Sequence, residues 1–229
     1  MAGIGCKLYP ILFVPPLWIA AYRLNQARLF VFGLLIGALP LGVLGLFTPW
    51  WNFLAFHAGR GLQCECLYAS VIWFLHHLGL CDASWTTTKA WTDITGPAAS
   101  AVLPYAKCLF LGMTVFSVTF ATWRAWRVQS ALGSLEISRI LLMILLPFVA
   151  FNTVFSPQYL VWLAVFAAFL YLGREKRHFF LIIIAAMITP IVYPSKYYSE
   201  GLYLAEAGML ALRNLILSMV SVLMFRHWK

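Results

Sequence analysis

Seven apolar runs, separated by polar stretches, follow one another along this chain. Runs of this length predict helices. We place them at residues 8–22, 29–47, 98–122, 139–153, 159–172, 179–194 and 207–225. A helix needs roughly 20 apolar residues to cross a bilayer. The pattern therefore predicts an all-α integral membrane protein with about seven transmembrane helices.

Residues 48–97 interrupt this pattern, because they form a stretch far longer than a turn between two helices needs. Its central apolar part, residues 67–80, is too short to cross a membrane. We therefore expect an interfacial or re-entrant helix within a long loop. Tryptophan favours the lipid headgroup zone, and the flanking tryptophans are Trp50, Trp51, Trp73, Trp85 and Trp91. Alternatively, these rings form a stacking platform for a sugar.

The composition agrees with a membrane protein. Hydrophobic residues make up 63% and charged residues 10% of the chain, and the mean hydropathy is +0.87. Globular domains carry about 25% charged residues, so we expect residues 1–229 to form a single multi-spanning membrane domain. The formal net charge is +9. It does not indicate a nucleic-acid partner, because the basic residues are scattered over the ends of the runs.

The basic residues instead predict the orientation of the chain, because loops rich in Lys and Arg stay cytoplasmic. One alternate set of loops holds most of them, with Glu136 and Glu175 as its acids. The N-terminus is then outside and the C-terminus cytoplasmic, in what we expect to be a bacterial inner membrane. Residues 48–97 and 194–206 lie on the extracytoplasmic face. An outside N-terminus without a recognisable leader indicates the C-terminal portion of a longer polypeptide, or preceding spans supplied by a partner.

Two polar segments lie on that face. The first, residues 56–65, reads FHAGRGLQCE, and the second, residues 151–162, reads FNTVFSPQYLVW. With KLYP at residues 7–10, in this order and spacing, they resemble the C-terminal half of the polyprenol-phosphate-mannose-dependent α-mannosyltransferases of the GT-C glycosyltransferase superfamily. The resemblance covers residues 7–162. It implies a membrane enzyme that transfers a hexose, here mannose, from a polyprenyl-phosphate donor to a glycolipid or glycan acceptor outside the cytoplasm, with inversion at the anomeric carbon.

Candidate ligands for the donor phosphate are cations and hydrogen-bond donors, because the leaving phosphate gains negative charge as the glycosidic bond breaks. Arg60 is the first candidate, since the glycines beside it let the backbone approach a ligand closely. His57 and Gln63 are neighbouring donors. Lys196 could replace a lysine that members of the family often carry where this chain has Thr153. Alternatively, Arg60 reaches the headgroup phosphates of the bilayer.

Candidate ligands for the sugar or the acceptor come from both polar segments. They are Glu65, Ser156, Gln158 and Tyr159. Glu65 is the acid of the family pattern, and we expect it to bind sugar hydroxyls or to hold Arg60 in place. The other three offer donors and acceptors around Pro157, which stiffens the turn. Alternatively, Ser156 is an N-cap, with Pro157 as the first helical residue.

The catalytic residue is unknown. Enzymes of this superfamily place their general-base aspartate in an early outer loop, which has no counterpart here. We therefore expect the chain to be incomplete as an enzyme by itself, with an N-terminal-half polypeptide as candidate partner. A non-catalytic subunit of a glycosyltransferase and a small multi-pass transporter are the alternatives. No metal or other cofactor is expected, since a Cys-x-Cys pair with scattered histidines is a poor metal site.

Two further groups of residues on the outer side are expected to be structural. Arg213 and Glu206 lie two turns apart on one face of the last apolar run. Cys64, Cys66 and Cys81 lie where a disulfide could form.

Overall fold

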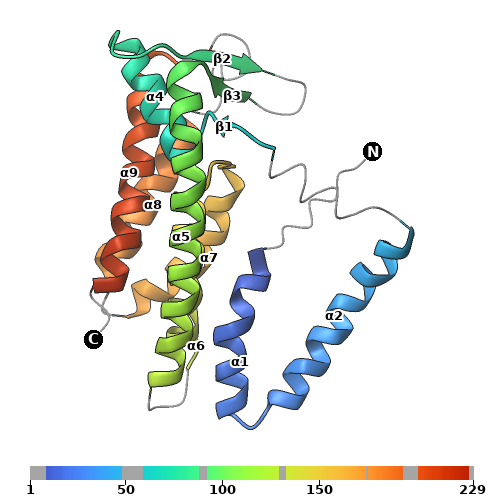
Figure 1. Ribbon diagram of the computed structural model, residues 1–229. Coiled ribbons are helices and arrows are strands. Elements are labelled where there is room, and N and C mark those ends of the chain that lie inside the picture. The colour runs from blue at the N-terminus through green and yellow to red at the C-terminus, as the bar shows by residue number, and fades with distance from the viewer. Residues whose placement is uncertain are drawn as a thin grey trace.

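The chain folds mainly into helices (Figure 1). The structure is a computed structural model, and it describes residues 9–47, 59–87, 92–128, 133–173, 175–192 and 201–226. In order, the elements are the 3-10 helix η1 (Tyr9–Phe13), α1 (Val14–Arg23), α2 (Ala27–Phe47), β1 (Leu62–Gln63), α4 (Leu67–His77), β2 (Ser84–Thr87), β3 (Thr92–Thr95), α5 (Pro97–Arg127), α6 (Ser134–Ala150), α7 (Gln158–Leu172), α8 (Lys176–Val192) and α9 (Leu204–Arg226).

Each of the seven apolar runs lies mainly on a helix, so the prediction of a mainly helical chain is confirmed. Among the described residues, the helices α2, α5 and α9 are long and apolar enough to cross a membrane. The apolar helix α7 is shorter, with 15 residues. These lengths are consistent with a helical membrane protein.

Prolines stand at the beginning of two helices, where an N–H group has no partner within the helix. Pro15 and Pro16 lie in the first turn of α1, and Pro97 opens α5. Gly96, directly before α5, has a φ of 106°. A Cβ on Gly96 would lie 3.3 Å from the Cα of Ala83, so glycine suits both the backbone and the space.

Helix α6 lies at the centre of the bundle and packs against α5, α7 and α9. Its side chains from Ile140 to Leu146 are all buried. A helix that is apolar all round is suited to a protein core or to a membrane. Helix α6 forms part of the core of the bundle.

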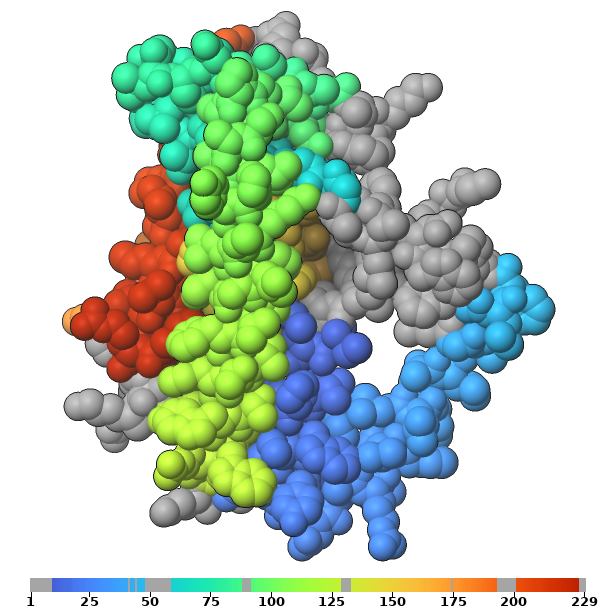
Figure 2. All heavy atoms as spheres, in the orientation of Figure 1, coloured from blue at the N-terminus to red at the C-terminus, as the bar shows by residue number. Residues whose placement is uncertain are grey.

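Helix α2 is apolar as well, but it has the opposite environment. It stands apart from the bundle (Figure 1), and open space separates part of it from α1 (Figure 2). Leu35, Leu39 and Leu46 are exposed. This exposed apolar surface suits contact with lipid or with another helix.

The long stretch between α2 and α5 contains the expected short helix, here α4, together with a sheet that the sequence did not predict. The three antiparallel strands have the order β1-β3-β2. Helix α4 packs along α9. Trp73 on α4 is buried, and its Nε1 donates to the carbonyl of Leu202 at 2.9 Å. Trp73 is therefore neither an exposed membrane anchor nor an open sugar platform.

Trp85 packs on Trp73, with 5.3 Å between the ring centroids, so both rings belong to one packed cluster. The other tryptophans of this prediction, Trp50, Trp51 and Trp91, lie outside the described residues.

The register of the sheet separates its two faces. Leu62 on β1 pairs with Ile94 on β3, and both side chains are buried. The next pair, Gln63 and Asp93, is half-buried. Because successive side chains of a strand point to opposite faces, Gln63 and Asp93 share the face away from the buried pair.

The two ends of the bundle differ in character. The sheet and α4 lie at one end, and the turns after α1 and α5 lie at the other (Figure 1). At that second end, Arg23 Nη1 donates to the carbonyl of Ala125 at 3.2 Å. Arg139 Nε lies 3.4 Å from Glu175 Oε2, which joins the start of α6 to the turn before α8. The basic turns therefore gather at the end away from the sheet.

Candidate functional site

The two polar segments meet in the structure. The backbone N–H of Gln63 in the first segment donates to the carbonyl of Thr153 in the second at 3.0 Å. Nearby, Tyr68 Oη donates to the carbonyl of Phe151 at 3.1 Å. Asn152 Oδ1 accepts from the N–H of Val154 at 2.9 Å, a side-chain bond that shapes the turn. Segments far apart in sequence thus form one polar region beside β1.

Arg60 enters this region directly before β1. Its Nη2 lies 3.7 Å from Asp93 Oδ1 on β3, and the two side chains are 9% and 15% exposed. Gly61 also lies beside this carboxylate, since a Cβ there would be in ordinary contact with Asp93 Oδ2 at 3.4 Å. The two facing atoms, Arg60 Nη2 and Asp93 Oδ1, are buried, and their 3.7 Å separation is longer than a strong charge-assisted hydrogen bond.

Tyr159 at the start of α7 brings the second segment to the same region. The positive charge of Arg60 acts electrostatically on its phenol group. Its ring stacks on Trp162, with 4.7 Å between the centroids. Gln158 beside it is exposed. A cation, a phenol and an exposed amide therefore come from the two segments.

Ser156 does not have the capping role that the sequence allowed. Helix α7 begins at Gln158 with Pro157 as its N-cap, and no side-chain bond caps it. The backbone carbonyl of Ser156 instead accepts from the N–H of Tyr159 at 2.8 Å. The side chain of Ser156 is half-buried at the edge of the region.

Glu65 lies behind this surface, because its side chain is only 3% exposed. Its Oε2 accepts from Arg213 Nη1 at 3.5 Å, and its backbone carbonyl accepts from Arg213 Nη2 at 2.8 Å. Arg213, on α9, is itself fully buried. The structure thus pairs Glu65 with Arg213, while Arg60 is paired with Asp93. Glu65 is therefore a buried structural residue next to the site.

Further bonds complete the network around Arg213. Thr189 Oγ1 accepts from Arg213 Nη1 at 3.1 Å, and Asn214 Oδ1 accepts from Arg213 Nε at 3.1 Å. Asn214 Nδ2 donates to the carbonyl of Glu65 at 2.9 Å. A buried charge is tolerated when it is paired and hydrogen-bonded in this way. The network ties the first polar segment to α8 and α9.

Burial makes the thiol of Cys66 and the phenol of Tyr68 hard to ionise. Desolvation raises the pKa of Cys66 from 9.0 to about 12, against the opposing hydrogen bond from the N–H of Ala69. Desolvation also raises the pKa of Tyr68 above its usual value. Cys64, Cys66 and Cys81 are free thiols, so the disulfide that the sequence allowed is not formed. Among the described residues, no three or more His, Cys, Asp or Glu side chains gather as metal ligands.

The structure therefore brings together part of the predicted site and adds residues to it. Arg60, Gln63 and Tyr159 contribute to one region, whereas His57 and Lys196 lie outside the described residues. Sequence reasoning missed Asp93, whose only signal was an acid within the outer stretch. It identified Arg213 and Glu206 as structural, but not the partner of either. Glu206 Oε2 accepts from the N–H of Tyr203 at 3.0 Å, at the start of α9.

This region gathers charged and neutral polar groups. Arg60 offers a cation, Asp93 an acceptor, and Gln63, Gln158 and Tyr159 offer neutral polar groups. Such a set suits a phosphate carried next to a polyhydroxylated group. No family model, no curated protein and no solved structure matches this chain.

Proposed function

We propose that this chain is a membrane glycosyltransferase of the GT-C kind, or the C-terminal part or a subunit of one. It transfers a hexose, with mannose as the first candidate, from a polyprenyl-phosphate donor to a glycolipid or glycan acceptor on the extracytoplasmic side. The observation that carries the proposal is the bond from the N–H of Gln63 to the carbonyl of Thr153, which joins the two polar segments. Convergence of these segments is what a shared donor site requires.

In this proposal Arg60 binds the phosphate of the donor. A phosphate oxygen competes with Asp93 for the guanidinium, because the present pair is 3.7 Å apart; the buried Nη2 of Arg60 becomes exposed when the donor binds. A bidentate bond from Arg to phosphate is shorter and stronger than such a contact. The guanidinium of Arg60 then stabilises the negative charge that develops on the leaving phosphate.

The sugar and the acceptor are assigned to the neutral groups beside Arg60. Gln158 and Tyr159 offer amide and phenol groups at the start of α7, and Ser156 lies before them. Gln63 faces the same side of the sheet as Asp93. Hydrogen bonds from such groups select a sugar by its hydroxyl pattern.

The orientation in the bilayer is also part of the proposal. All seven apolar runs cross the membrane, the N-terminus is outside, and the C-terminus is cytoplasmic. The position of the basic turns, at the end of the bundle away from the sheet, supports this orientation. The candidate site then lies on the outer face, where a polyprenyl-linked sugar is presented.

The proposal assigns no general base. Glu65 is engaged by Arg213, and Asp93 is engaged by Arg60. A base must come within hydrogen-bond reach of the acceptor hydroxyl, directly or through one water. The proposal therefore includes both an enzyme and a donor-binding subunit that acts with a catalytic partner.

Photocrosslinking tests the donor site. The full chain in nanodiscs is irradiated with a photoactivatable polyprenyl-phosphate mannose, and the labelled peptides are mapped by mass spectrometry. We expect labels within residues 59–66 and 151–162, and about tenfold less labelling in Arg60→Gln, since a hydrogen bond to a charged group is worth about 1.5–3 kcal/mol. Arg177→Gln, a change of an exposed cation on α8, is the matched control. Labels elsewhere, or equal labelling in Arg60→Gln, would refute the proposal.

A transfer assay then separates the enzyme from the subunit. The purified chain is supplied with labelled donor and with lipid or glycan acceptors. Transfer by the chain alone identifies an enzyme, whereas crosslinking without transfer identifies a donor-binding subunit.

A further inference from the structure

Lys107 lies inside α5, one of the helices that are long and apolar enough to cross a membrane. It stands roughly 15 Å from the start of that helix, at 1.5 Å per residue. Its side chain is half-buried, while Tyr105 and Leu109 close to it are exposed. A cation at such a depth is costly, so an ionisable residue within a membrane helix is a candidate functional residue.

Lys107 is level with the second polar segment. Helix α5 begins beside the sheet, whereas α6 ends at the segment that bonds to β1, so the two helices run in opposite directions (Figure 1). The rings of Phe110 on α5 and Phe148 on α6 pack with 5.3 Å between their centroids. About one turn from these rings towards the sheet, α5 carries Lys107 and the other chain segment carries Phe151. The two therefore stand at the same height of the bundle.

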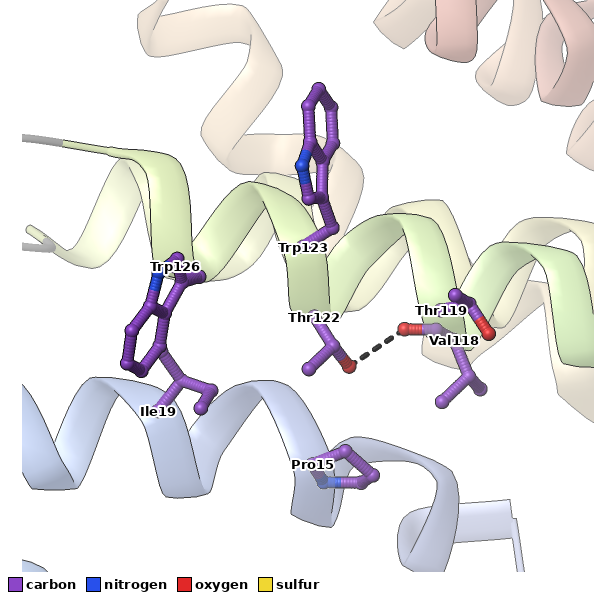
Figure 3. A pocket seen from close by; sticks show the side chains of 7 residues that line it. All are labelled: Pro15, Ile19, Val118, Thr119, Thr122, Trp123 and Trp126. Carbon is purple, nitrogen blue, oxygen red and sulfur yellow. Dashed lines mark hydrogen bonds between the residues drawn. The ribbon is translucent and has the colours of Figure 1, made fainter.

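The face of α5 that carries Lys107 is turned towards α1. Val118 follows about three turns later and Ala125 about five turns later, so both share that face at 3.6 residues per turn. Val118 points towards α1 (Figure 3). The carbonyl of Ala125 accepts from Arg23 of α1 at 3.2 Å. Helix α1 reaches less far towards the sheet than α5 does (Figure 1), so Lys107 looks over its end.

Helix α7 turns one of its faces to the same space. Phe13 of η1, directly before α1, packs edge-on against Phe166 of α7, with 6.1 Å between the ring centroids. Tyr159 lies about two turns before Phe166, on the same face and nearer to the sheet. The charge of Arg60 acts on the phenol group of Tyr159. Lys107 from α5, Tyr159 from α7 and Arg60 from the start of the sheet therefore border one side of α6.

We propose that Lys107 is a second ligand of the donor phosphate, together with Arg60, an inference that rests on the proposed function. In a polyprenyl-phosphate sugar the phosphate is a diester with one negative charge. When the bond from the anomeric carbon to the phosphate oxygen breaks, its electron pair stays on the phosphate. The monoester that remains carries a charge of about −1.5 to −2 at pH 7. Lys107 stabilises this additional charge, because Asp93 and Arg60 already face each other.

Binding of a short phosphate lipid tests the proposal. The full chain in detergent is titrated with farnesyl phosphate and, in parallel, with farnesol, its uncharged analogue. Lys107→Gln should weaken the binding of farnesyl phosphate about tenfold and leave that of farnesol unchanged, as expected for the loss of a charged hydrogen bond. Lys107→Arg keeps the charge and should restore most of the affinity.

The matched control is Arg127→Gln, which removes an exposed cation from the other end of the same helix. It should leave the binding of both compounds unchanged. Thermal unfolding in the same detergent verifies that each variant is folded.

Two outcomes would overturn the inference. Equal weakening for farnesyl phosphate and farnesol in Lys107→Gln would mean that Lys107 only supports the packing of α5. Unchanged binding of farnesyl phosphate in Lys107→Gln, with weaker binding in Arg60→Gln, would remove Lys107 and leave the proposed donor site at Arg60 intact. Weaker binding in Lys107→Gln but not in Arg60→Gln would support Lys107 as a phosphate ligand and contradict the donor site proposed at Arg60.

Discussion

The guanidinium of Arg213 lies over the ring of Phe155, with 4.2 Å between its Cζ and the ring centroid. The same guanidinium donates to the backbone carbonyl of Glu65 at 2.8 Å. One buried side chain of α9 therefore contacts both polar segments. Arg213 therefore holds the two polar segments of the candidate site next to each other.

Replacement of Arg213 by Met should destabilise the protein by about 3–5 kcal/mol, because it leaves Glu65 as a buried charge without its partner. Glu65→Gln should be destabilising for the same reason, since Arg213 then loses its counter-charge. The double variant should cost less than the sum of the two, because neither charge remains unpaired. Chemical unfolding in detergent micelles measures these values. Strictly additive effects would contradict the pairing.

A second prediction concerns Gly201, in the loop before α9. Its φ is 81°, and a Cβ there would lie 3.2 Å from Trp73 and 3.3 Å from Trp85. Gly201→Ala should therefore destabilise the protein by about 1–3 kcal/mol, through backbone strain and the displacement of these rings. Gly112→Ala on α5 is the matched control, because open space surrounds that position. It should be neutral or stabilising by up to about 1 kcal/mol. Equal thermal unfolding midpoints for the two variants would contradict this account.

The third prediction concerns the reactivity of Cys66. With a pKa of about 12, roughly one thiol in ten thousand is ionised at pH 8, and the thiolate is the reactive form. N-ethylmaleimide should therefore modify Cys66 in the denatured protein long before it modifies Cys66 in the native protein. Peptide mass spectrometry at timed intervals measures both rates. Comparable rates at pH 8 would show that Cys66 is not held in a buried, protonated state.

The raised pKa of Cys66 also makes the stability of the folded protein depend on pH. The pKa of Cys66 is higher in the folded chain than its ordinary value of 9.0, so the folded state holds this proton more tightly. Its contribution to stability is complete below pH 9 and is lost as the pH rises towards 12. Unfolding measured between pH 8 and pH 11 should show this decline, and it should be smaller in Cys66→Ala.

The fourth prediction concerns Asp93, which competes with an incoming phosphate for Arg60. Asp93→Asn should tighten the binding of a polyprenyl phosphate without a sugar by about five- to tenfold, because the variant removes the carboxylate that lies 3.7 Å from the guanidinium. Isothermal titration in detergent measures the dissociation constant. Weaker binding by Asp93→Asn would mean that the carboxylate orients Arg60 instead of competing for it.

There are physical reasons why α5 was predicted from the sequence and the sheet was not. The run at 98–122 predicted α5 closely, because apolar length alone indicates a long helix; α5 extends to Arg127 through Trp and Arg residues that the run leaves out. The sheet was missed because β2 and β3 are short and rich in threonine, without alternating apolar residues. Register, and with it the approach of Asp93 to Gln63, follows only from the pairing of these strands.

The site was predicted in part for a similar reason. Arg60, Gln63 and Tyr159 lie in polar segments that interrupt apolar runs, so they were visible in the sequence. The pair of Glu65 and Arg213 was not, because 148 residues separate the two and no local pattern connects them. Only the packing of α9 against α4 brings them together.

The most direct test of the central claim is the affinity of the chain for a polyprenyl phosphate, measured for the wild type, Arg60→Gln and the control Arg177→Gln. If Arg60 binds the phosphate in a site formed by both polar segments, Arg60→Gln should weaken binding by about 10- to 100-fold. Arg177→Gln should leave it unchanged. Equal affinities for all three proteins, with each variant folded, would contradict the account.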